Sequence, residues 1–82
     1  MSVIHGTYLD QWSTIEKYGL RQGAKLTREL PNAGEIIPGM ESECDVFIYI
    51  NKKFMGNNNP LVTTSHIHPK DFEMVLFVPR TG

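Results

Sequence analysis

Apolar positions recur at helical spacing near the start of the chain, which predicts a short helix over residues 9–18. Asp10 suits the first turn of this helix and Lys17 the last, because each charge opposes the helix dipole. Gly19 is the residue type that commonly follows a helix end. The positions that form the stripe are Leu9, Trp12, Ile15 and Glu16.

Alternating apolar residues later in the chain predict strands. Residues 44–50 give the clearest strand, because they are rich in β-branched and aromatic side chains and place Val46, Ile48 and Ile50 on one face. Shorter strands are expected at 61–64 and 72–78, and an N-terminal strand at the apolar pair Val3-Ile4, with a brief helical turn over 52–55. Together these elements predict an α+β fold, a small lobe of mixed or antiparallel strands with one or two short helices.

Residues 21–40 show no clean period and contain several glycines and prolines, so most of this segment is expected to be loop. Loops of this length are unusual in small domains and are often functional. The N-terminal strand begins within two residues of Met1, which suggests that something normally precedes it.

Length and composition narrow the classes further. The chain has 82 residues and a net charge of −1, which allows one small domain and argues against nucleic-acid binding through bulk charge. The single cysteine, Cys44, favours a reducing compartment, so we expect an intracellular protein of the cytoplasm or nucleus. We find no apolar run long enough to span a membrane, and the N-terminus lacks the pattern of a signal peptide.

Two groups of residues are candidates for binding phosphate or sugar. His5-Gly6-Thr7 follows an apolar pair, where glycine permits close approach of a ligand and the imidazole and hydroxyl can hydrogen-bond it. The alternative is a strand-end turn with a surface histidine. Arg21, Lys25 and Arg28 could gather positive charge around a phosphate, or could be solvated side chains of a polar loop.

The sequence offers two further candidates, a metal site and a thiol nucleophile, and for each a purely structural role is the stronger alternative. His66 and His68 would share a face of a strand, as a metal requires, but no further ligand is evident and a solvated loop before Pro69 is the alternative. Cys44 paired with a histidine could act as a nucleophile, whereas a buried structural thiol is the default for a cysteine opening an apolar strand.

Taken together, the order of these motifs resembles the NAD-dependent tRNA 2′-phosphotransferase family. That family begins with an apolar-His-Gly-Thr strand, followed by a helix that contains a tryptophan and ends in Gly-Leu. A loop then leads to a Gly-Met pair, a cysteine and a hydrophobic strand, and a last apolar strand closes the match. The corresponding residues here are Ile4-His5-Gly6-Thr7-Tyr8, Trp12, Ile15, Gly19-Leu20, Gly39-Met40, Cys44 to Ile50, Val75-Leu76 and Pro79 to Gly82.

The resemblance implies that residues 1–82 form a single ADP-ribosyltransferase-like lobe, with the family's N-terminal RNA-binding lobe absent. It implies NAD as cofactor and 2′-phosphorylated tRNA as substrate, the RNA 2′-phosphate being transferred to NAD⁺ with release of nicotinamide. A missing lobe or partner chain would complete the protein. In this reading the cofactor is held by His5, Gly6, Thr7 and Arg21, and the catalytic residues are Lys25 and Arg28.

The chain also departs from the family pattern. The family's arginine aligns best with Lys25, and its two histidines align with Thr27 and Glu29. The family's Gly-Met-Arg becomes Gly39-Met40-Glu41, which reverses a charge. These changes keep a second hypothesis open, in which the chain is a non-catalytic or truncated module that binds ADP-ribose or NAD.

Overall fold

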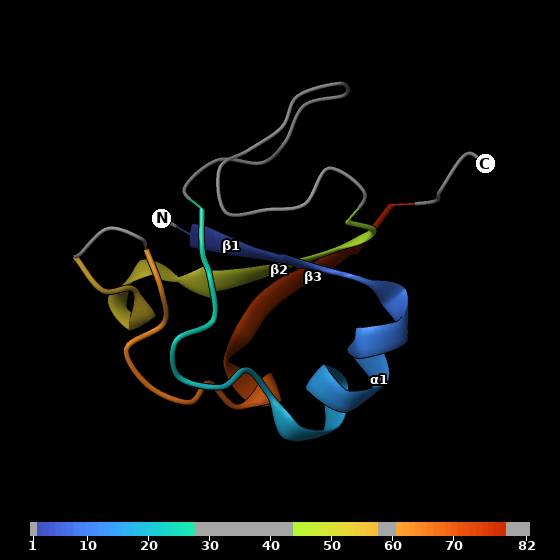
Figure 1. Ribbon diagram of the computed structural model, residues 1–82, viewed down its shortest axis with the longest axis horizontal. Helices are drawn as coiled ribbons and strands as arrows, with labels where there is room; N and C mark the ends of the chain where they lie inside the picture. Colours follow the sequence, from blue (N-terminus) through green and yellow to red (C-terminus); the bar gives the residue numbers. More distant parts are fainter. Residues whose placement is uncertain (1, 28–43, 58–60, 79–82) are drawn as a thin grey trace.

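The computed structural model describes residues 2–27, 44–57 and 61–78 and shows a small α+β fold (Figure 1). Three strands form one antiparallel sheet in the order β1-β2-β3. The predicted α+β class is therefore confirmed, and of the two strand arrangements left open the sheet has the antiparallel one. In chain order the elements are β1 (Ser2–Thr7), α1 (Leu9–Tyr18), β2 (Val46–Asn51), the 3-10 turns η1 (Lys52–Phe54) and η2 (Pro69–Asp71), and β3 (Phe72–Phe77).

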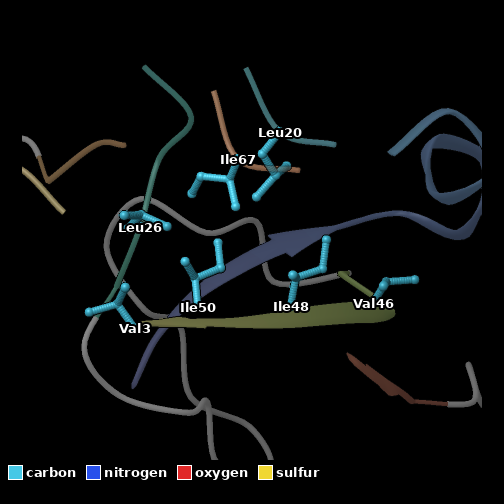
Figure 2. Close-up of a cluster of buried hydrophobic side chains, with 7 residues drawn as sticks. All are labelled: Val3, Leu20, Leu26, Val46, Ile48, Ile50 and Ile67. Atoms are coloured by element: carbon cyan, nitrogen blue, oxygen red, sulfur yellow. The ribbon is translucent and has the colours of Figure 1, made fainter. Parts of the chain in front are cut away.

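β2 is the central strand, and its alternating side chains form the middle of the core. Val46, Ile48 and Ile50 point to the same side of the sheet, as the alternation predicted, and none has solvent-exposed surface (Figure 2). Their partners across β1 are Thr7, His5 and Val3 in that order, so His5 lies over the core-facing side of the sheet. The register of two strands thus brings a histidine to the edge of the hydrophobic core.

A layer of extended segments covers this side of the sheet. Leu20 pairs with Ile67, Lys25 with Val62 and Thr27 with Ile4, each as an isolated antiparallel bridge. Leu20 and Ile67 then face the apolar side chains of β2 and close the core between the two layers (Figure 2). Within the segment predicted as loop, Lys25 and Thr27 are therefore held by isolated bridges to two different partners, while residues 28–40 lie outside the described residues.

α1 packs on the same side through its two central apolar residues. The Trp12 ring lies 5.5 Å from the Phe77 ring in an edge-on arrangement, and Ile15 is half-buried against the core. Leu9 is 59% exposed, so its place in the predicted apolar stripe was wrong. Leu9 is the first residue of α1, and its main-chain amide, rather than its exposed side chain, is hydrogen-bonded to another part of the chain. No helix in the described ranges is long and apolar enough to cross a membrane.

Both ends of α1 lie at the predicted residues, and both are stabilised by distant parts of the chain. Tyr8, at the N-cap, makes no capping bond with its side chain, and the Leu9 amide instead donates to the Asp45 carboxylate at 2.7 Å. At the other end Gly19 adopts φ 85°, and a Cβ there would overlap the Ile67 carbonyl oxygen. Glycine is required at this position for both reasons.

Candidate functional site

His5 is joined to the segment that carries Lys25. Its Nδ1 lies 2.7 Å from the main-chain carbonyl oxygen of Lys25. A carbonyl oxygen can only accept, so the proton is on Nδ1 and His5 is the donor. In a neutral imidazole the other nitrogen, Nε2, is then an acceptor. The structure thus brings together a residue predicted to bind the cofactor and one predicted to be catalytic.

Burial sets the charge of this histidine. Desolvation lowers the pKa of His5 below its usual 6.5, and the hydrogen bond to Lys25 only partly offsets that effect. The imidazole is therefore neutral at pH 7. A neutral ring with a defined tautomer offers one acceptor atom for a hydroxyl group, rather than a positive charge for a phosphate.

Gly6 and Thr7 complete the predicted His-Gly-Thr tripeptide, and they lie on opposite faces of β1. Because side chains alternate along β1, His5 and Thr7 lie on the core-facing side and Gly6 on the opposite side. Thr7 is buried opposite Val46, and its carbonyl accepts from the Asp45 amide at 3.1 Å. Of the two polar side chains, that of His5 is half-buried and that of Thr7 is buried.

Arg21 is the first residue of a short turn and Lys25 directly follows its last residue, and both residues are exposed. The turn is closed by the Ala24 amide, which donates to the Arg21 carbonyl at 3.3 Å. Gly23 supplies φ 87° inside it, a conformation that glycine adopts without strain. Two of the three predicted basic residues are thus presented by one hydrogen-bonded segment. The third, Arg28, lies outside the described residues.

Thr27 occupies the position that aligns with a histidine of the tRNA 2′-phosphotransferase pattern. It is only 9% exposed and exchanges two main-chain hydrogen bonds with Ile4, at 2.8 and 2.9 Å. A side chain buried in this way has little surface to offer a ligand. Glu29 and Glu41, the other two departures, lie outside the described residues.

The remaining candidates are His66, His68 and Cys44, and the sequence did not predict their contacts. The rings of His66 and His68 lie 4.8 Å apart, and the His66 Nε2–H donates to the Tyr18 carbonyl at 2.6 Å, at the end of α1. In the described part of the chain no group of three or more metal-ligating side chains occurs. Cys44 is half-buried, two residues before β2.

The described residues thus place a neutral histidine beside an exposed turn that carries Arg21 and Lys25, on an antiparallel α+β lobe. Residues 1–66, which include all six predicted site residues, match the RNA 2′-phosphotransferase, Tpt1/KptA family, and the chain belongs to this family. The chain is also similar to "tRNA 2′-phosphotransferase 1" of Danio rerio, with 33% identity over 73 residues. That alignment covers 73% of this chain and 32% of the relative, so the chain spans about a third of the curated relative's length.

Family membership confirms the recognition made from the motifs. It also supports the general class of transferase implied by them, because every motif from the His5 strand to Cys44 lies inside the matched region. The sequence signal that carried this recognition was the order of the motifs, since each motif alone is short.

Proposed function

We propose that this chain is an NAD-dependent transferase of the tRNA 2′-phosphotransferase type, acting inside the cell on spliced RNA. Its reaction would move an internal RNA 2′-phosphate to NAD⁺ and release nicotinamide. The observation that carries the proposal is the family match over residues 1–66, within which His5 is bonded to the segment of Lys25.

The chemistry of the described residues supports ADP-ribose as the part of the cofactor that this chain would hold. The Nε2 of neutral His5 can accept a hydrogen bond from a ribose hydroxyl, while the main chain at Gly6 and Thr7 lies beside it on β1. The exposed guanidinium of Arg21 can pair with the pyrophosphate. When bound, NAD⁺ supplies an electrophilic ribose carbon that carries nicotinamide as the leaving group.

Lys25 and Arg28 are the residues we propose for the reacting phosphate. Two anionic groups must approach each other, and cations between them reduce their repulsion. Lys25 provides an ammonium group that acts as a point charge, where the family's arginine would provide a two-pronged contact. We therefore expect weaker orientation of the phosphate at this position than in relatives with arginine.

The test is direct. An RNA oligonucleotide with an internal 2′-phosphate is incubated with NAD⁺ and the purified chain, and phosphate loss and nicotinamide release are measured together. We expect both products in equal amounts, reduced by at least tenfold in Lys25→Ala. Absence of product above the protein-free control, at high protein concentration, would reject catalysis by this chain.

A second function is favoured by Thr27. Its burial at a position aligned with a family histidine removes a polar group from the site and fits a module that binds ADP-ribose or NAD without turnover. Titration calorimetry with ADP-ribose distinguishes the two. Binding that is lost in His5→Ala, together with no product in the RNA assay, would support the binding module.

A further inference from the structure

Thr63 holds the turn between Arg21 and Lys25 from a position about 40 residues further along the chain. Its side chain is only 1% exposed. The Oγ1 hydroxyl donates to the Arg21 carbonyl at 2.9 Å and accepts from the Ala24 amide at 3.1 Å. The main chain adds two bonds, from the Thr63 amide to the Ala24 carbonyl at 2.9 Å and from the Gly23 amide to the Thr63 carbonyl at 3.0 Å.

These four bonds hold the turn at both of its ends. Each of them is shorter than the bond that closes the turn, in which the Ala24 amide donates to the Arg21 carbonyl at 3.3 Å. The hydroxyl of Thr63 contacts both ends of the turn, one through a carbonyl and the other through an amide. It therefore sets the separation of the two ends.

The same turn carries the two exposed cations. Arg21 is its first residue, and Lys25 follows its last. On the far side, the carbonyl of Lys25 is held by His5. The backbone at Lys25 is thus held by His5 and the backbone at Arg21 by Thr63, and this backbone fixes the points from which the two exposed side chains extend.

We infer that Thr63 is a positioning residue for a diphosphate ligand, an inference that rests on the proposed function. By holding the turn, it sets the spacing at which the Arg21 and Lys25 cations are presented. In the absence of RNA, when Lys25 holds no reacting phosphate, a ligand with two linked phosphates engages both cations and depends on that spacing. A ligand with one phosphate can be held by either cation and depends on it much less.

The experiment compares ADP-ribose with AMP by titration calorimetry, using the whole chain. Thr63→Val removes the hydroxyl and keeps the branched shape. We expect about tenfold weaker binding of ADP-ribose, a loss of about 1.4 kcal/mol, and less than about twofold change for AMP. Thr63→Ser restores the hydroxyl and is expected to restore ADP-ribose affinity to within about twofold.

The neighbouring Thr64 provides a matched control. Its hydroxyl donates to the Phe54 carbonyl at 3.2 Å, away from the turn. Thr64→Val also removes one hydroxyl-to-carbonyl bond, and we expect its ADP-ribose affinity to match that of the unmodified chain. Amide resonances of Gly23 to Lys25 should shift in Thr63→Val and not in Thr64→Val.

The possible failures are distinguishable. If the unmodified chain binds neither ligand, the proposed function fails and this inference fails with it. If the unmodified chain binds ADP-ribose and Thr63→Val binds it equally well, only the inference is overturned. Equal losses for ADP-ribose and AMP would also overturn it, because they indicate a general structural role. Should Thr63→Val not fold, Thr63→Ala removes the same hydroxyl without placing a methyl group against the Arg21 carbonyl.

Discussion

The carboxylate of Asp45 accepts a hydrogen bond from the amide of Leu9 at 2.7 Å and so serves as the N-terminal cap of α1 across 36 positions of sequence. Asp45 also joins two strand ends, because its amide donates to the Thr7 carbonyl and its carbonyl accepts from the Val78 amide. One residue therefore links the end of β1, the start of α1 and the residue that follows β3.

Asp45→Ala is expected to lower the free energy of unfolding by about 1 kcal/mol, because the first amide of α1 loses its acceptor. Urea denaturation followed by circular dichroism measures the change. Asp10→Ala, in the same turn of the helix and exposed, is the control and should cost less. Equal losses for the two variants would contradict a capping role for Asp45.

The low pKa of His5 predicts a specific dependence of stability on pH. The folded protein binds the His5 proton more weakly than the unfolded chain does, so protonation favours unfolding. The penalty is absent well above 6.5, grows as the pH falls below that value, and becomes constant beneath the lowered folded pKa.

His5→Asn keeps a donor for the Lys25 carbonyl and removes the titration. The difference in unfolding free energy between the unmodified chain and this variant should therefore decrease as the pH is lowered from about 8 to about 5. Denaturant titrations at several pH values provide the measurement. Parallel curves for the two proteins would show that His5 does not carry this dependence.

Ile48 and Met74 lie on adjacent strands and should respond differently to truncation. Ile48 has no exposed surface, whereas Met74 is among the exposed residues of β3. Ile48→Ala is expected to cost about 2–5 kcal/mol, enough to unfold a chain of this size, and Met74→Ala well under that range. Thermal unfolding distinguishes them, and similar midpoints would mean that the core is not centred on β2.

Two glycines with positive φ should also differ. Gly19→Ala would place a Cβ against the Ile67 carbonyl, so we expect this variant not to fold. Gly23→Ala has open space and carries only the conformational cost, about 1 kcal/mol. A folded Gly19→Ala protein with stability close to that of Gly23→Ala would show that the main chain at Ile67 can move aside.

Local pattern was enough to predict most of the elements. The spacing of Trp12 and Ile15, with Gly19 after them, gave α1 its correct bounds, and the alternation of Val46, Ile48 and Ile50 gave the central strand. The family could also be recognised from the sequence, because its motifs occur in the same order here. For the candidate site, the sequence predicted which residue types are present but not which of them contact one another.

What the sequence by itself determined is therefore the set of elements, the family and the candidate residues, since these depend on neighbouring positions and on motif order. The tertiary structure decided which residues meet. The contacts of His5 with Lys25, His66 with Tyr18 and Thr63 with Arg21 span 20, 48 and 42 positions. No local periodicity encodes such pairs, because strand register and layer packing establish them. The same packing buries His5 and so keeps it neutral, and the bonds of Thr63 hold the turn beside it.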